Sequence, residues 1–361
     1  MRQIAIASLK EGFAVARPVY NAQGGIVVPQ GSILTSHHIE KLSGMGISAV
    51  FVDDPYTEGL IVEEVLTEEL RIRLFRCLRH AMAALRLQSS FAGDGLDLRE
   101  LHRLTTAMLQ QLSPCLDREI VLTQTSSYRD YEAQHPINVA VLSYITGRAL
   151  GLNSQALEDL LQAALLQNIG YVFLPPDLID REGELTPSEL EKMRAHPEKG
   201  YQLLKATKGL NASVMATVYQ HHERWDGSGY PLGLAGDRIY PLARILAVAD
   251  TYDALISERP YRRAYMPHEA IEYVMGFGGE QFDYYVVDAF TRNTPSYNVG
   301  TRVRLNSGDE GFVVKSNRGL VARPKVRVFW TEDGRELPKP YEIDLSLPQN
   351  QSKLVVAVVN A

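Results

Sequence analysis

The chain has 361 residues, which is longer than a single hydrophobic core usually supports, so two or three domains are expected. Hydrophobic residues make up 45% of it and charged residues 22%, a balance that allows a buried core and excludes wholesale disorder. Its 37 basic and 43 acidic side chains leave a net charge of −6, which argues against a protein that binds nucleic acid or an anionic membrane.

Cysteine usage and hydropathy give an expectation about the compartment. The two cysteines, Cys77 and Cys115, lie in no metal-type spacing and cannot form a disulfide framework. The first residues interrupt their apolar run with Lys10 and Glu11, and no uncharged apolar run approaches the ~18 residues of a membrane span. We therefore expect a cytoplasmic protein with no nucleic-acid or membrane partner.

Residues 1–115 form the first compositional zone. Apolar runs separated by turn signals predict a β-hairpin over residues 14–34. A short amphipathic stretch follows Thr35, and an apolar run over residues 46–52 predicts a buried strand. Together these elements predict a small N-terminal β/α module over residues 1–60.

A long helix is predicted after this module. Apolar residues recur at helical spacings from residue 61 onward, among them Leu66, Leu70, Leu74 and Leu78. We interpret residues 61–115 as a helical linker. Its apolar stripe fits a homodimer built on the linker, and it fits equally well a helix that packs on its own domain.

The second zone, residues 116–294, is predicted to be helical. Apolar residues at helical spacings predict helices over residues 135–151, 154–167 and 240–256. Thr186 and Glu189 have the spacing of a capping box, which predicts that another helix begins there. The last helix of this set carries Asp250 and Asp253 as its conspicuous acidic residues.

The third zone, residues 295–361, changes its period. Apolar residues alternate or run together between turns rich in Asn, Gly and Asp, which predicts a small antiparallel β-barrel or sandwich. The expected fold is therefore mainly α, a helical bundle with a small β/α module before it and a small β domain after it. The function of the β domain does not follow from its sequence.

Four histidines of the helical zone lie in company that suggests a metal site. They are His135, His196, His221 and His222, they belong to different helical segments, and Asp250 lies on another. Imidazole and carboxylate groups are the ligands that zinc, iron and manganese take in proteins. Taken singly, each histidine is more often a hydrogen-bonded core residue than a ligand.

The sequence around these histidines resembles the HD-GYP domain, the bacterial phosphodiesterase branch of the HD superfamily, which acts on cyclic di-GMP. The resemblance is carried by HHERWDGSGYP (221–231), AVADTYDALISERPYR (247–262) and GGEQFD (278–283). It runs in register from about Tyr131 to Phe290. An unrelated helical bundle would not reproduce several separated motifs in this order.

The resemblance implies a set of metal ligands: His135, His196, His221, His222 and Asp250. It also marks a departure from the family pattern in the motif that gives the family its name. Gln167 stands where the family has histidine, Asn168 where it has aspartate, and Tyr171 where it has lysine. Tyr131 stands where some members have a glutamate that supports a third metal.

These substitutions change what the site can hold. The family's aspartate bridges two metal ions, whereas the neutral amide of Asn168 offers one weak donor and an NH2 group that repels a cation. We expect the site of His135 and Asp250 to be empty. His196, His221 and His222 could hold one zinc, iron or manganese ion. The alternatives are no metal, with the amides hydrogen-bonded to histidines, and a normal metal pair.

The resemblance also assigns residues to the ligand. Arg259, Arg262 and Tyr230 correspond to positions near the guanine and phosphate of the nucleotide, and arginine suits both groups. The alternative for the two arginines is a structural turn with solvated side chains. Asp253 is expected to be a helix cap or the salt-bridge partner of one of them.

The leading hypothesis is a degenerate HD-GYP signalling protein with little or no hydrolytic activity. It binds cyclic di-GMP, the linear dinucleotide pGpG, or a protein partner through the Gly229-Tyr230-Pro231 loop or the β domains. The first alternative is an active phosphodiesterase that uses a reduced metal site. The second is a structural scaffold.

Overall fold

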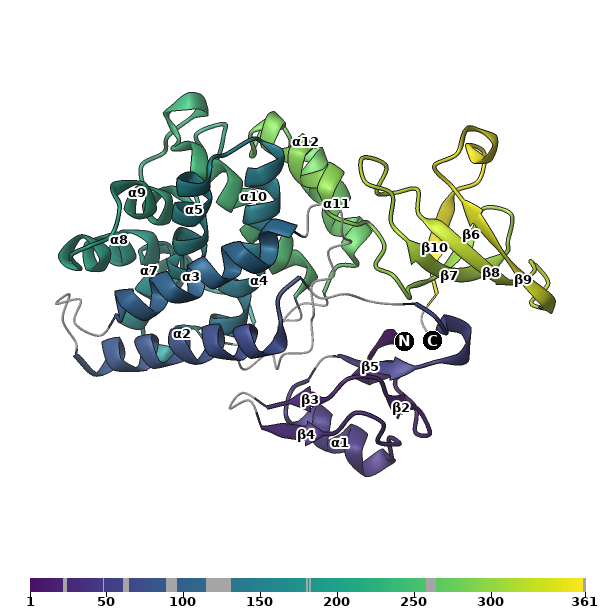
Figure 1. Ribbon diagram of the computed structural model, residues 1–361. Helices are drawn as coiled ribbons and strands as arrows, with labels where there is room; N and C mark the ends of the chain where they lie inside the picture. The colour runs from purple at the N-terminus through teal and green to yellow at the C-terminus, as the bar shows by residue number, and fades with distance from the viewer. Residues whose placement is uncertain are drawn as a thin grey trace. The chain divides into compact units, whose positions relative to one another are not determined.

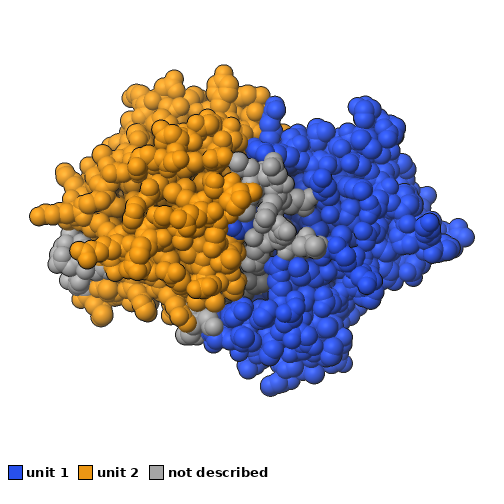
Figure 2. Space-filling model, in the orientation of Figure 1, with its two compact units in different colours: residues 1–65, 117–130, 291–361 blue, residues 66–116, 131–290 orange. Residues whose placement is uncertain are grey.

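The computed structural model describes residues 1–21, 25–47, 49–60, 65–88, 96–114, 131–179, 181, 183–257 and 264–359. The chain divides into two compact units, coloured separately in Figure 2. Unit 1 combines residues 1–65, 117–130 and 291–361, and unit 2 combines residues 66–116 and 131–290. The fold is mainly α with small sheets near both ends of the chain, which confirms the expected fold class.

The N-terminal part of unit 1 is a small β/α module. Its strands and helix are β1 (Arg2–Ala5), β2 (Ala14–Val15), β3 (Val19–Tyr20), β4 (Ile26–Val28), α1 (Ser36–Gly44) and β5 (Ala49–Asp53). Strand β5 lies between β1 and β2 in an antiparallel sheet, and β3 pairs with β4 in a hairpin. The side chain of Thr35 caps α1 by accepting a hydrogen bond from the backbone N–H of His38 at 3.3 Å.

The C-terminal part of unit 1 is a five-stranded antiparallel sheet in the order β10-β6-β7-β8-β9. Its strands are β6 (Arg302–Leu305), β7 (Glu310–Lys315), β8 (Lys325–Trp330), β9 (Glu336–Asp344) and β10 (Val355–Val358). Four strands follow one another as a meander, and the last strand pairs with the first (Figure 1). The alternating apolar residues close a core around Val303, Val313 and Val328, each completely buried.

Side chains join the two parts of unit 1 directly. The ring of Tyr56 lies 5.1 Å from that of Phe329 and 4.8 Å from that of Trp330. Phe51 and Val299 belong to one small apolar cluster, although they are far apart in the sequence. The N-terminal module therefore contributes to the same unit as the C-terminal sheet.

Unit 2 is built from helices. They are α2 (Glu68–Gln88), α3 (Leu98–Leu112), α4 (Tyr131–Ala149), α5 (Ser154–Leu166), α6 (Pro176–Ile179), α7 (Pro187–Arg194), α8 (His196–Ala206), α9 (Ala212–Gln220), α10 (Pro241–Ile256), α11 (Pro267–Gly276) and α12 (Tyr284–Asn293), the last of which runs into unit 1. Helices α4 and α10 are buried on nearly every side, and each packs against the other and against α5 (Figure 1). Among the described residues, no helix has the length and apolar character to cross a membrane.

Helix boundaries follow the expected signals. Asn153 caps α5 by accepting a hydrogen bond from the Ala156 N–H at 2.9 Å. At α7, the carboxylate of Glu189 accepts a hydrogen bond from the backbone N–H of Thr186 at 2.9 Å, as the capping-box pattern predicts.

A close backbone contact sets the position of the segment after α5. This segment is the short 3-10 helix η5 (Ile169–Phe173), which packs against α8. A Cβ on Gly170 would collide with the backbone oxygen of His196 and lie 2.7 Å from the backbone nitrogen of Gly200. Glycine at position 170 therefore lets η5 lie against the beginning of α8, which brings Tyr171 close to His196.

Candidate metal and ligand site

Three histidines from two places in the chain converge in unit 2. His196 is the first residue of α8, and His221 and His222 directly follow α9. One ring nitrogen from each lies within 4.8 Å of the others, and we call this group the three-histidine cluster. The Nε2 atoms of His196 and His221 are 3.4 Å apart.

Hydrogen bonds fix the orientation of the two most buried rings. Nδ1 of His196 donates to the backbone oxygen of Met193 at 2.8 Å, and Nδ1 of His221 donates to that of Val218 at 2.7 Å. The proton on each Nδ1 leaves the Nε2 lone pair free toward the cluster, which is the arrangement that metal-binding histidines use.

The three rings are neutral at physiological pH. Burial, with the neighbouring His221, lowers the pKa of His196 to about 3. Burial likewise lowers the pKa of His221 and of His222. Neutral imidazole is the form that binds a transition metal, so no proton has to be displaced.

Two of the three nitrogens in the three-histidine cluster lie at the separation expected of ligands to one metal ion. Two nitrogens bound to a tetrahedral zinc at about 2.0–2.1 Å would lie roughly 3.3–3.4 Å apart. The separation of 3.4 Å between Nε2 of His196 and Nε2 of His221 matches that value. The cluster could therefore hold one ion, with a fourth position left for water or a ligand oxygen.

His135 lies in a different environment. It sits on the buried helix α4, and both of its ring nitrogens contact carboxylates of α10. Nε2 is 2.8 Å from Oδ1 of Asp250, and Nδ1 is 2.7 Å from Oδ2 of Asp253. Asn138, one turn along α4, donates to the other oxygen of Asp253 at 3.0 Å. We call these four residues, with Gln167, the His135 network.

Opposite charges are in direct contact in the His135 network. Burial alone would lower the pKa of His135, but hydrogen bonds to Asp250 and Asp253 raise it to about 9. Burial also opposes ionisation of Asp250, yet the hydrogen bond from His135 holds the pKa of this carboxyl below its usual value. At neutral pH the network therefore contains an imidazolium and two carboxylates.

Gln167 completes the network. Its Nε2 lies 3.1 Å from Nε2 of His135 and donates to Oδ1 of Asp250 at 3.2 Å. With His135 protonated, two N–H groups converge on this one oxygen. The opposite amide orientation would place a carbonyl oxygen against the carboxylate, so the hydrogen bonds define it.

This arrangement does not fit a metal ion shared by His135 and Asp250. Their facing atoms are already bonded to each other, and the NH2 group of Gln167 lies against both. Among the described residues, the side-chain oxygens of Gln167 and Asn168 are buried without a hydrogen-bond partner. These amide oxygens carry no charge, so they are much weaker ligands for a cation than carboxylate oxygens are.

Asp253 differs from its expected role. We expected it to cap a helix or to pair with Arg259 or Arg262, but its carboxylate hydrogen-bonds to His135 and Asn138 and is completely buried. The available signal was its position three residues after Asp250, which places both carboxylates on one face of α10.

Two tyrosines border the three-histidine cluster. The ring of Tyr171 lies 4.4 Å from that of His196, and the ring of Tyr230 stacks on His222 at 4.8 Å. His196 and His221 are each 1% exposed, whereas His222 and Tyr230 are partly exposed. Tyr171 is partly exposed as well, so these three side chains form the border of the cluster that lies nearest to solvent, and we call the part at His222 and Tyr230 its open side.

The loop that carries Tyr230 is held by its own backbone. The carboxylate of Glu223, 1% exposed, accepts hydrogen bonds from the N–H groups of Leu232 at 2.6 Å and Leu234 at 2.8 Å. A Cβ on Gly229 would collide with the backbone nitrogen of Arg224 and lie 2.5 Å from the oxygen of His222. Sequence reasoning had assigned no role to Glu223, which fixes this loop.

The remaining predicted site residues are less informative. Arg259 and Arg262 lie outside the described residues, so their assignment to the ligand stays a prediction. Tyr131 stacks on the ring of His135 at 4.7 Å and so covers the His135 network.

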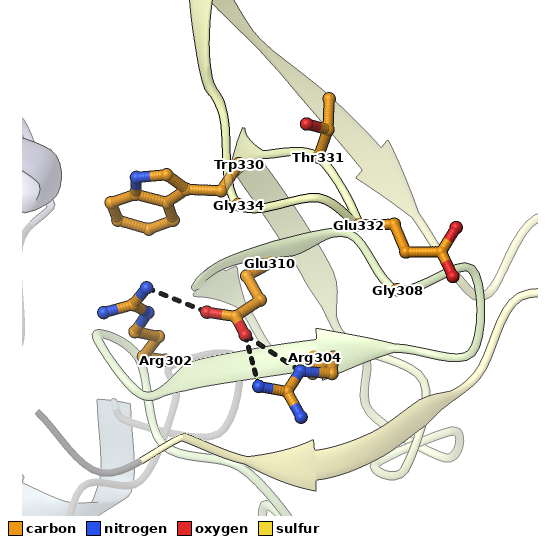
Figure 3. Close-up of a pocket in the computed structure, with 8 residues that line it drawn as sticks. All are labelled: Arg302, Arg304, Gly308, Glu310, Trp330, Thr331, Glu332 and Gly334. Carbon is orange, nitrogen blue, oxygen red and sulfur yellow. Dashed lines mark hydrogen bonds and ion pairs between the residues drawn. The ribbon is translucent and has the colours of Figure 1, made fainter.

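A hollow on the C-terminal sheet is a second candidate site (Figure 3). It has a volume of about 500 Å³ and is lined by Arg302, Arg304, Gly308, Glu310, Trp330, Thr331, Glu332 and Gly334. Glu310 lies between two guanidinium groups and binds Arg302 at 2.8 Å and Arg304 at 2.7 Å. The guanidinium of Arg302 also lies 4.1 Å from the centre of the Trp330 ring. Because these charges satisfy one another, the hollow gives no indication of its ligand.

Two family models match separate parts of the chain. A family model described as an HD domain matches residues 114–286, and one described as a KOW domain associated with HD domain matches residues 302–361. A solved structure of an HDG"Y"P protein from Bdellovibrio bacteriovorus covers 80% of this chain and 98% of that chain, with 16% identity and a TM-score of 0.47.

Two curated relatives carry names that describe an activity. A Pseudomonas aeruginosa protein named a cyclic di-GMP phosphodiesterase is 31% identical over 279 residues, 77% of this chain and 67% of that protein. A Xanthomonas campestris protein named a cyclic di-GMP phosphodiesterase response regulator is 39% identical over 155 residues, 42% of this chain and 41% of that protein. Because the alignment with the Pseudomonas protein extends over most of both chains and includes the histidine and Gly229-Tyr230-Pro231 motifs, the chain belongs to the HD-GYP family.

Proposed function

We propose that this chain binds a cyclic dinucleotide or its linear product, cyclic di-GMP or pGpG, beside a single metal ion, and that hydrolysis there is impaired or lost. The relatives named cyclic di-GMP phosphodiesterases support the ligand class. The observation that carries the proposal is the position of Gln167, whose NH2 group lies against both His135 and Asp250.

The metal part of the proposal rests on donor chemistry. The three-histidine cluster offers neutral imidazoles at a spacing suited to zinc, iron or manganese. When bound, such an ion would supply Lewis-acid polarisation of a phosphoryl oxygen. His196 and His221 are held by backbone hydrogen bonds, and so they would bind it without reorganising.

Impaired hydrolysis follows from what the His135 network contains. Phosphodiester cleavage by paired ions needs positive charge near both the attacking and the leaving oxygen. Here the ligands of one half of the site are bonded to each other, and Asn168 supplies an amide in place of a bridging carboxylate. Tyr171 adds no positive charge where the family has lysine.

An active phosphodiesterase with a reduced metal site is the second candidate. The observation in its favour is that the three-histidine cluster keeps a position for a fourth ligand on the side that solvent reaches. A water in that position beside a Lewis acid is a known source of hydroxide near neutral pH.

One set of measurements separates these functions. Elemental analysis of the purified chain gives the metal stoichiometry, and calorimetric titration with cyclic di-GMP and pGpG gives the affinities. Turnover of cyclic di-GMP is followed with added Mn, Fe or Zn, in parallel with His221→Ala. We expect about one metal per chain, measurable binding and no turnover. Turnover that His221→Ala abolishes would establish the active phosphodiesterase. If the chain binds neither cyclic di-GMP nor pGpG, the proposed function is rejected.

A further inference from the structure

Two arginines lie beside Tyr230, on the side from which solvent reaches the three-histidine cluster. The guanidinium carbon of Arg194, at the end of α7, is 5.4 Å from the centre of the Tyr230 ring. Arg224 belongs to the same loop as Tyr230, and its backbone packs against Gly229. Its guanidinium lies 4.9 Å from the centre of the Phe282 ring. Both positive charges act on the Tyr230 hydroxyl through space.

Neither arginine makes a direct ion pair with a carboxylate in the part of the chain that the structure describes. There, neither side chain makes an ion pair or donates a hydrogen bond, and Nη1 of Arg224 is buried without an acceptor. Arg224 influences Asp226, but that carboxylate accepts its hydrogen bonds from Ser228, from N–H at 2.9 Å and from Oγ at 2.7 Å.

A neighbouring arginine shows how the fold satisfies such a charge elsewhere. Arg244 lies 5.0 Å from the centre of the Trp225 ring, and it also pairs with Asp237 at 3.1 Å and with Asp283 at 3.2 Å. Arg194 is exposed, and its charge is solvated at little cost. The partly buried Arg224 is different, because a donor removed from water without an acceptor is destabilising.

We propose that Arg194 and Arg224, the arginine pair, bind a phosphoryl group of the ligand at the open side of the three-histidine cluster. The identity of the ligand rests on the proposed function. Guanidinium groups bind phosphate through paired N–H donors, and neither arginine uses its donors in an ion pair among the described residues. The pair would also place positive charge in the region where Tyr171 provides none.

The open side of the cluster suits a nucleotide in shape as well as in charge. Tyr230 and His222 form a partly exposed aromatic stack, to which a planar base can add. A cyclic dinucleotide carries two phosphodiesters and pGpG carries one phosphodiester and a terminal phosphate. The two positive charges of the arginine pair match either ligand more closely than one charge would.

The test compares nucleotide affinity among variants of the full chain. The variants are Arg194→Ala, Arg224→Met and the double variant, with methionine chosen to keep the packing on Phe282. The control is Arg238→Ala, because Arg238 is exposed in the same region and makes no ion pair among the described residues. Cyclic di-GMP and pGpG are titrated separately, so the two phosphate sources are distinguished.

We expect the double variant to bind about 10- to 100-fold more weakly, the effect of losing charge-assisted hydrogen bonds, and Arg238→Ala to stay within about 2-fold. We also expect the ligand-free Arg224→Met chain to melt at the same or a higher temperature than the wild type, since it no longer buries an unpaired donor. A purely structural arginine would lower the melting temperature instead.

The outcomes separate this proposal from the proposed function. If the wild type binds nucleotide and the double variant binds within about 2-fold of it, the arginine pair is rejected and the proposed function stands. If the wild type binds no nucleotide, its melting temperature is compared in inorganic phosphate and in chloride at equal ionic strength. This comparison tests the arginine pair without a nucleotide. Stabilisation by phosphate that the double variant loses would support the arginine pair, and no stabilisation would reject it as well.

Discussion

Replacing Asp253 with asparagine tests whether the His135 network is held by charge. Asp253 is completely buried and accepts hydrogen bonds from His135 and Asn138. The rise of the His135 pKa from 6.5 to about 9 corresponds to roughly 3 kcal/mol at 1.36 kcal/mol per unit. Because the imidazolium contacts two carboxylates, we assign about half of this to Asp253.

The sign of the pH dependence follows from the direction of each shift. The His135 pKa is raised on folding, so its contribution is fully present below pH 6.5 and is lost as the pH rises through about 9. The Asp250 pKa is lowered on folding, so its contribution is present above the ordinary value of 3.8 and is lost as the pH falls. The network is therefore expected to stabilise the fold most between about pH 4 and 6.5.

Urea denaturation in buffer with a chelator measures the free energy of unfolding at pH 6, 7.5 and 9. We expect the wild type to lose about 3 kcal/mol of unfolding free energy from this network between pH 6 and 9, and Asp253→Asn to lose about half as much. The control is Asp159→Asn, because Asp159 is a buried carboxylate whose partners Asn211 and Gln155 are neutral. An equal pH dependence in wild type and Asp253→Asn would refute the assignment of an imidazolium between two carboxylates.

Three further predictions test other parts of the molecule. The double variant Gln167→His with Asn168→Asp should raise the metal content from one to two equivalents per chain, because it replaces two amides with an imidazole and a carboxylate. Elemental analysis measures this content, and an unchanged value would show that these two residues do not limit metal uptake. Gly170→Ala should destabilise unit 2 by about 3 kcal/mol or more in thermal unfolding, because its Cβ meets the backbone of α8. The matched Gly276→Ala should stay within about 1 kcal/mol, since its Cβ meets no described atom within 4 Å, and equal effects at the two positions would contradict the proposed close packing. Tyr56→Ala should destabilise unit 1 by about 2–4 kcal/mol, because the ring packs on Phe329 and Trp330, and leave the metal content unchanged; a fall in metal content would show that unit 1 supports the site.

Local signals in the sequence predicted the elements well. The cap at Thr35 and the capping box at Thr186 are formed by residues three apart, and such interactions depend little on the rest of the fold. The alternation of the C-terminal zone predicted antiparallel strands because one face of each strand is buried in a shared core. The three histidines were recognised through the motifs around them rather than through their spacing.

Contacts between distant segments were beyond such signals. His135 and Asp253 are 118 residues apart, and only the packing of α4 against α10 brings them together. The contact of Tyr56 with Trp330 likewise joins opposite ends of the chain. The lack of a hydrogen-bond acceptor for Nη1 of Arg224 among the described residues also depends on tertiary structure, because a sequence shows which polar groups exist but not which of them meet.

The two halves of the candidate site differ in how much charge each already holds. In the His135 network, an imidazolium and two carboxylates satisfy one another, and the amide of Gln167 occupies an acceptor that a cation would need. The three-histidine cluster is neutral, and Arg194 and Arg224 near its open side make no ion pair with any described residue. In the proposed function one cation and one anion bind on that side, while the His135 and Asp250 atoms that would bind a second cation are already hydrogen-bonded to each other. On the proposed function, binding of a nucleotide and its hydrolysis depend on different residues, so the first can be retained without the second.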